Sequence, residues 1–280
     1  MCSAERRTIN ELLARYDLEP ELQDVIVEGE YDCDLLRSSI ASSSTNVLFY
    51  SIDTIDVPNS VLTKYSLTSG NKQRVLAFAK EMEANLQGEF SYICLTDRDL
   101  DPWFGKLEVI RNHRWTTYSS LEMHFVNREF VSHLLYDVCR VKMDDFSAIY
   151  ESSIQLLKMY FSFRCTAKEL SLDFTTIPIK KCVSKKDGTL YFEFDEFIQK
   201  SLNKNGQIEL FSDVKSKVDK WYNNFNGDER HYIRGHDFFE LMAFIVKQFG
   251  GYKELSTEVA ISRLCINSAL NDSRISAEIT

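Results

Sequence analysis

Short apolar runs alternate with helical patterns over the first half of the chain. Apolar residues recur every three or four positions at 8–16, 32–40 and 69–86, which predicts helices there, and helical spacing resumes from Leu121. Short runs rich in β-branched and aromatic residues predict strands at 24–27, 47–52, 90–95 and 114–118. Strands that alternate with helices form a parallel sheet covered by helices. The pattern therefore predicts an α/β fold, and such sheets bind ligands at the carboxyl ends of their strands.

Helical patterns dominate the rest of the chain. They predict helices at 130–140, 144–165, 212–225, 236–249 and 257–270. A strand pair at 176–183 and 189–194, joined by the turn-forming string KKDG, interrupts them. We therefore expect two domains: residues 1–126 with the sheet, and residues 127–280 as a mainly helical lobe with a hairpin near 176–194.

The net charge, the cysteines and the lengths of the apolar stretches limit the classes of protein to which this chain can belong. The net charge of -9 argues against a surface coated in positive potential, so any contact with nucleic acid must be local. The seven cysteines form no CxxC pair, which favours reduced thiols and a cytoplasmic location. No apolar stretch is long enough to span a membrane, so we expect no membrane association.

Acidic residues stand where this fold places its chemistry. Glu28 directly follows the first predicted strand, and Asp97 and Asp99 follow the third in the string LTDRDLD. In an extended segment, residues two apart point the same way, so Asp97 and Asp99 are expected to share one cation. Carboxylate oxygens suit Mg²⁺, and Glu28 would serve either as a further ligand or as the base. The simpler alternative is an acidic turn with no metal.

These strings resemble those of a known domain. VEGEYDCDLL followed by LTDRDLD resembles the TOPRIM domain, a Rossmann-like parallel four-stranded sheet with flanking helices. In that domain a strand-end glutamate and a DxD motif bind Mg²⁺ for phosphodiester chemistry. The resemblance implies that Asp32 opens the first helix and joins the metal-binding carboxylates. The string SGNKQRV, which contains Lys72, looks like the glycine-containing entry to the second TOPRIM helix.

Two further strings are similar to TOPRIM nucleases related to the OLD family. TTYSSLEMHFV implies that Glu122 is an additional metal ligand. RGHDFFELMAFI looks like the helix start of those nucleases, with His236 at the basic catalytic position in place of lysine. The resemblance thus implies a catalytic set of Glu28, Asp97, Asp99 and His236, with one or two ions of Mg²⁺ or Mn²⁺.

Within this group, the chain looks most like the AriB-type effectors of the PARIS phage-defence system. That resemblance implies an endoribonuclease held silent by an ABC-type ATPase partner (AriA-like). It further implies release on phage sensing, a homodimer in the released state, and cleavage of host tRNA.

Several basic residues are candidates for binding the substrate. Arg111 and Arg114 lie between the DxD motif and Glu122, where they would flank a phosphate or belong to a solvated loop. Arg234 and His236 mark a predicted helix start, which favours anions. The substrate-binding set is Lys72, Arg98, Arg111, Arg114 and Arg234.

Two other functions fit the same residues. The first is an OLD-like TOPRIM nuclease that acts on DNA. The second is a non-catalytic subunit with a vestigial TOPRIM site, whose helical half binds a partner.

Overall fold

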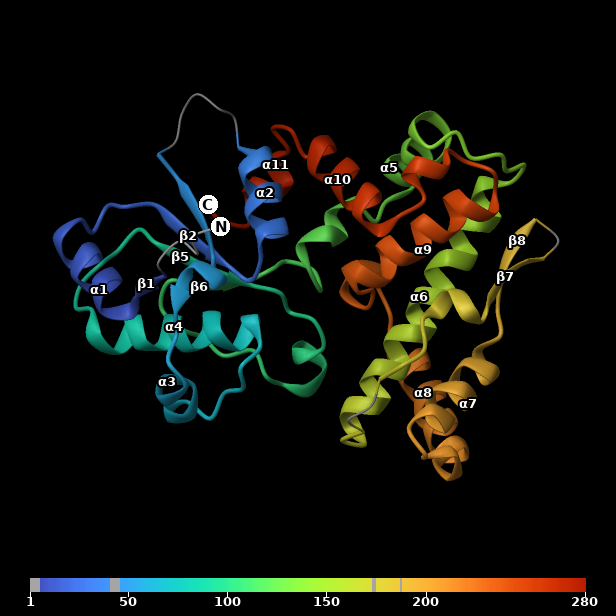
Figure 1. Cartoon of the computed structure of the whole chain (residues 1–280), viewed down its shortest axis with the longest axis horizontal. Coiled ribbons are helices and arrows are strands. Elements are labelled where there is room, and N and C mark those ends of the chain that lie inside the picture. The colour runs from blue at the N-terminus through green and yellow to red at the C-terminus, as the bar shows by residue number, and fades with distance from the viewer. Residues whose placement is uncertain (1–5, 41–45, 173–174, 187) are drawn as a thin grey trace. The chain divides into compact units, whose positions relative to one another are not determined.

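The computed structural model describes residues 6–40, 46–172, 175–186 and 188–280 (Figure 1). The chain divides into two compact units, Met1–Leu121 with Cys265–Thr280, and Glu122–Leu264. The first unit thus includes residues 265–280, which the sequence analysis assigned to the helical lobe. No helix among these described residues is long and apolar enough to cross a membrane.

The first unit is built on a parallel sheet of four strands in the order β3-β2-β5-β6. A small second sheet pairs β1 with β4 in parallel. The elements of the unit are β1 (Arg7–Thr8), α1 (Ile9–Leu18), β2 (Asp24–Val27), α2 (Glu30–Ser39), β3 (Leu48–Ser51), β4 (Ile55–Asp56), α3 (Asn59–Lys64), α4 (Asn71–Asn85), β5 (Ile93–Thr96), β6 (His113–Trp115) and α11 (Ser273–Ser276). The predicted α/β class and the parallel sheet with flanking helices are confirmed.

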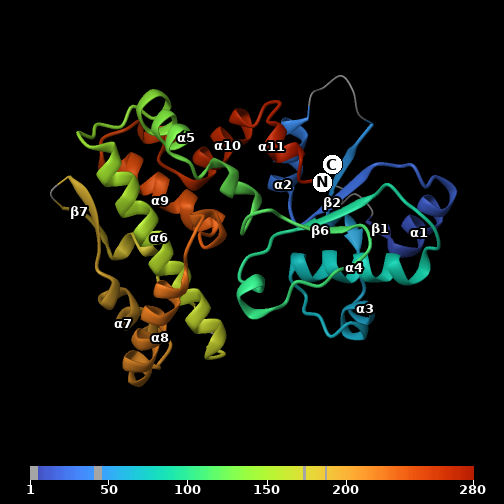
Figure 2. The same ribbon diagram turned by 180° about the vertical axis from the view of Figure 1, so that it is seen from behind.

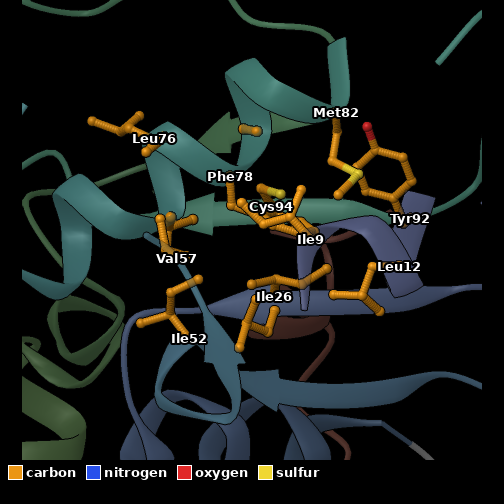
Figure 3. Close-up of a cluster of buried hydrophobic side chains, with 14 of the residues drawn as sticks. Ile9, Leu12, Ile26, Ile52, Val57, Leu76, Phe78, Met82, Tyr92 and Cys94 are labelled. Carbon is orange, nitrogen blue, oxygen red and sulfur yellow. The ribbon is translucent and has the colours of Figure 1, made fainter. Parts of the chain in front are cut away.

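The core of this unit lies between the sheet and helices α1 and α4. Apolar residues of both helices pack on Ile26 of β2 and Cys94 of β5, all of them buried (Figure 3). Figures 1 and 2 show α4 along one face of the sheet, with α2 and α11 on the other face. Because both faces are covered, β2 is buried along its whole length, as expected of a central parallel strand. The residues that follow the carboxyl ends of the strands lie beyond this covered part of the sheet.

The second unit is mainly helical and centres on α6. This long helix packs against α8, α9 and β8, and its aromatic residues carry much of the core. The rings of Phe161 and Phe225 pack edge to face with 5.4 Å between their centroids. Those of Phe163 and Phe197 do the same at 5.3 Å. The elements are α5 (Arg128–Ser132), which continues as a π-helix (His133–Val138), α6 (Phe146–Glu169), β7 (Val183–Lys186), β8 (Thr189–Phe192), α7 (Phe194–Lys204), α8 (Phe211–Asn224), α9 (Gly235–Gln248) and α10 (Glu258–Ser268), the last of which runs into the first unit.

The strand predicted at 176–183 is wrong over most of its length. Pro178, which lacks an N–H and has a fixed φ, instead precedes a short 3₁₀ helix at Ile179–Lys181. The strand β7 begins only at Val183 and pairs antiparallel with β8. Asp187, in the expected KKDG turn, lies outside the described residues.

Helix α7 was not predicted, although its sequence has a helical period. Phe194, Phe197, Ile198, Ser201 and Leu202 are all buried, at spacings of three, four, seven and eight residues from the first. The strand predicted at 189–194 ends in this helix at Phe194. The helix therefore follows directly from β8.

The N-terminal capping box of α1 gives a direct test of the local structure. The hydroxyl of Thr8 accepts a hydrogen bond from the amide of Glu11 at 3.2 Å, and Glu11 Oε2 accepts one from the amide of Thr8 at 2.6 Å. We expect Thr8→Ala to lower the free energy of unfolding by about 1 kcal/mol in urea titrations, because one helix N–H loses its acceptor. Thr8→Ser keeps the oxygen and should cost much less. If the two variants lost equal unfolding free energy, the Thr8 hydroxyl would not be the capping group.

Candidate functional site

The register of the central strands brings Glu28 beside Asp97. Strands β2 and β5 are parallel neighbours, with Ile26 opposite Cys94, and Glu28 and Asp97 each follow the last residue of a strand. The amide of Asp97 donates a hydrogen bond to Glu28 Oε1 at 3.0 Å. A carboxylate from one strand end therefore lies against the backbone of the other, although the two residues are far apart in sequence.

Both acidic residues are held further by neighbouring groups. The side-chain amide of Asn71, at the start of α4, donates to the main-chain oxygen of Glu28 at 2.9 Å. The amide of Leu121 donates to Asp97 Oδ1 at 3.3 Å. These contacts fix the two residues to α4 and to the segment after β6.

The chain turns sharply after Asp97, which corrects the expectation of an extended segment. Strand β5 ends at Thr96, and Asp99 has the left-handed φ of 46°. The amide of Asp99 donates to the carbonyl of Ser119 at 2.8 Å, which stabilises this turn. The rule that residues two apart point the same way holds only in extended chain, so it does not apply to Asp97 and Asp99.

Lys72 holds the far side of this turn. Its ammonium lies 3.2 Å from Asp99 Oδ2 and 2.6 Å from Asp101 Oδ2, and it donates to the carbonyl of Arg98 at 3.3 Å. It also lies 5.3 Å from the centre of the Trp115 ring. Lys72 was among the predicted site residues. Asp101 was not, although it is the third aspartate in LTDRDLD and continues the two-residue spacing.

Charge and burial shift the pKa values of Lys72 and of His113, the first residue of β6. Burial alone would lower the pKa of Lys72, but the Asp99 charge and the hydrogen bond with Asp101 outweigh it and leave the pKa above its ordinary value. Burial and the nearby Lys72 charge lower the pKa of His113 to about 4. His113 is therefore neutral near pH 7, and its Nε2 lies 2.8 Å from the hydroxyl of Thr96.

The oxygen donors suit a hard cation. Mg²⁺ commonly takes only one or two carboxylates and completes its shell with waters and substrate phosphate, a demand that Glu28 and Asp97 can meet. Over the part of the chain that the structure describes, no group of three or more His, Cys, Asp or Glu side chains is arranged to hold a metal ion. The carboxylate of Asp99, one of the three expected ligands, is paired with Lys72 instead.

Asp32 lies in the first turn of α2, at the opening of the first helix as the resemblance implied. Helix α2 begins at Glu30, and Asp32 Oδ2 accepts a hydrogen bond from the amide of Gly29 at 3.1 Å. This is an N-terminal capping contact. This hydrogen bond gives Asp32 a structural role, because it stabilises the turn that follows Glu28.

The basic residues of the first unit are dispersed. The guanidinium of Arg111 donates to the carbonyls of Glu83, Leu86 and Gly88, at the far end of α4 from Lys72. Leu86, the C-cap of α4, lies fourteen positions after Lys72, which is roughly 21 Å along a helix.

Arg114 and Arg98 have different hydrogen-bonding surroundings from those of Arg111. Arg114 donates to the main-chain oxygen of Thr280 at 3.1 Å. Arg98 directly follows Asp97, and its Nε is buried with no hydrogen-bond partner among the described residues. Of the predicted substrate-binding arginines in this unit, Arg98 is the one that follows a strand-end carboxylate.

The remaining predicted site residues belong to the second unit. Glu122 is 6% exposed, and its carboxylate lies against the first turn of α9, where a Cβ on Gly235 would come within 2.5 Å of it. Arg234 is the N-cap of α9, and His236 is exposed. The positive end of this helix therefore faces a carboxylate of the protein itself, where the sequence suggested a bound phosphate.

Arg164 is a residue that the sequence analysis missed. Its guanidinium makes two hydrogen bonds to the buried carboxylate of Asp237, at 2.9 and 2.7 Å. This paired contact joins α6 to the first turn of α9. No local pattern in the sequence marks it, because the two residues lie on separate helices.

A cavity of about 880 Å³ lies in the first unit, away from Glu28 and Asp97. Its lining includes Val25, Ile93 and Asn112, which stand at or beside the amino ends of their strands, together with Arg114 and Ile279. The carboxylates stand at the opposite ends of β2 and β5. The candidate site is therefore identified by its chemistry and does not coincide with this cavity.

No known protein-family model matches the sequence, and no curated protein is detectably similar to it. The residues and their geometry are therefore what indicate a function.

The close approach of Gly235 and Glu122 can be tested by a double-mutant cycle. We expect Gly235→Ala to lower the free energy of unfolding by roughly 1–3 kcal/mol, because the added methyl group meets the carboxylate. In a Glu122→Ala background the same substitution should cost much less. Chemical denaturation of the four proteins measures this coupling, and equal costs in both backgrounds would contradict the contact.

His113 should make the protein sensitive to acid. Its pKa is about 4 when folded and near 6.5 when exposed, so the unfolded chain takes up the proton first as pH falls. The stability associated with neutral His113 should thus be lost as pH falls from about 6.5 to 4, by roughly 1–3 kcal/mol. We expect His113→Gln to flatten the curve of unfolding free energy against pH over this window. Parallel curves for the two proteins would show that His113 titrates normally.

Proposed function

We propose that the protein is a Mg²⁺-dependent nuclease that hydrolyses phosphodiester bonds at the ends of β2 and β5. One observation carries the proposal: the carboxylate of Glu28 meets Asp97 across neighbouring parallel strands, with 3.0 Å between Glu28 Oε1 and the Asp97 amide. Ligand sites of parallel α/β sheets lie at this edge. Acidic residues gathered there are suited to a hard cation and its phosphate substrate.

Each nearby residue has a role in this proposal. Glu28 and Asp97 hold the ion, which when bound would activate water and stabilise negative charge on the phosphate. Arg98 supplies a buried N–H that has no partner among the described residues, a donor suited to a phosphate oxygen. Lys72 offsets the negative charge of Asp99 and Asp101, so that an anionic substrate is repelled less.

The substrate in this proposal is structured RNA, and specifically host tRNA. The support is the resemblance of VEGEYDCDLL and LTDRDLD to TOPRIM nucleases of the PARIS type, together with a parallel sheet in which Glu28 and Asp97 directly follow β2 and β5. The same resemblance supports a cytoplasmic effector of antiphage defence, silenced by an ABC-type ATPase and dimeric when released.

Removal of either carboxylate should abolish cleavage without unfolding the protein. We expect Glu28→Gln and Asp97→Asn each to reduce cleavage of tRNA in Mg²⁺ by roughly a hundredfold or more, because each loses a charge that holds the ion. Gel assays with labelled tRNA and labelled DNA measure the rates, and thermal melting checks the fold. Glu89→Gln removes an exposed carboxylate near the amino end of β5 and serves as the matched control.

The outcomes separate the three functions. Cleavage of DNA alone would establish the DNA nuclease. If folded Glu28→Gln cleaved tRNA at the wild-type rate, Glu28 would not belong to the catalytic site. The absence of both cleavage and Mn²⁺ binding in the wild-type protein would favour a non-catalytic subunit.

A further inference from the structure

Lys72 stands at an unfavourable place for a cation in a helix. It is the second residue of α4, after the N-cap Gly70, where the helix dipole presents its positive end. A lysine here weakens the helix unless other contacts compensate for it. The compensating contacts must come from the turn after β5.

The ammonium of Lys72 is surrounded as a bound cation would be. Its three N–H groups face three oxygen acceptors, Asp99 Oδ2 at 3.2 Å, Asp101 Oδ2 at 2.6 Å and the Arg98 carbonyl at 3.3 Å. The face of Trp115 lies nearby, and the lysine side chain is only 12% exposed. A flexible surface lysine does not keep four such contacts, so this side chain is held in place.

The turn depends on that cation. Asp99 adopts a left-handed backbone conformation, which glycine, asparagine and aspartate reach more readily than other residues. Its carboxylate lies close to that of Asp101 through their shared partner. Two like charges so near each other repel unless a positive charge lies between them. Lys72 supplies that charge from the protein itself.

We propose that Lys72 takes the place of a second metal ion. The site then binds a single divalent ion at Glu28 and Asp97, while the ammonium of Lys72 occupies the cation position between Asp99 and Asp101. Lys72 is a positioning residue, because it acts through the two aspartates. This inference rests on the proposed function, since it assumes that Glu28 and Asp97 hold an ion.

Titration with Mn²⁺, followed by the electron paramagnetic resonance signal of the free ion, counts the bound ions. We expect one ion per chain for the wild-type protein and two for Lys72→Met, because the uncharged side chain leaves the aspartates to a metal. Adding Asp99→Asn to Lys72→Met should remove the second ion and keep the first. Lys80→Met, in the same helix but paired with Glu108, is the matched control and should bind one ion.

A second variant covers the case in which Lys72→Met does not fold. Asp99→Asn alone should still bind one Mn²⁺ ion, with an affinity within about threefold of the wild-type value, because this carboxylate is the partner of Lys72 and not a ligand. Loss of the ion in folded Asp99→Asn would overturn the inference. Two ions in the wild-type protein, or one ion in folded Lys72→Met, would overturn it as well.

Failure of the proposed function looks different. If Glu28→Gln and Asp97→Asn bind Mn²⁺ as the wild-type protein does, the ion is not held at the strand ends at all. If the wild-type protein binds no Mn²⁺, the premise of the inference fails with the function. The stoichiometry of Lys72→Met and the affinity of Asp99→Asn therefore test the lysine, whereas the two other variants test the site.

Discussion

The parallel pairing of β2 with β5 is the constraint on which the site depends. It places the ends of two strands at one edge of the sheet, so that Glu28 and Asp97 meet although 68 residues lie between them. The pairing is in turn fixed by packing, because helices cover both faces and a slip of one residue would move every side chain of the strand to the opposite packed face. A stable core thus holds the carboxylate of Glu28 against the backbone amide of Asp97.

The sequence predicted this part of the fold well because its signals are local. The strand at 24–27 was located to the residue, and the apolar stripe of α4 marked that helix. The strand-end position of Glu28 and Asp97 followed from the same signals. The geometry around Asp99 could not be predicted, because its turn is stabilised by Ser119 and by Lys72, which lie 20 residues later and 27 residues earlier in the chain.

The second unit shows the same limit of local patterns. A proline within an apolar run converted an expected strand into a 3₁₀ helix, and a stripe that begins at Phe194 formed a helix that was not predicted. Gly235 of the RGHD string resembled a motif in the sequence. Only the structure shows why a glycine is needed there, because the Glu122 carboxylate occupies the space that a Cβ would fill. Likewise, no periodicity reveals that residues 265–280 join the first unit.

The most direct test of the central claim is anomalous X-ray diffraction from crystals of the protein grown with Mn²⁺. Our account predicts one anomalous peak bonded to carboxylate oxygens of Glu28 and Asp97, with Lys72 still between Asp99 and Asp101. Saturating Mn²⁺ with no peak at these two residues would contradict it.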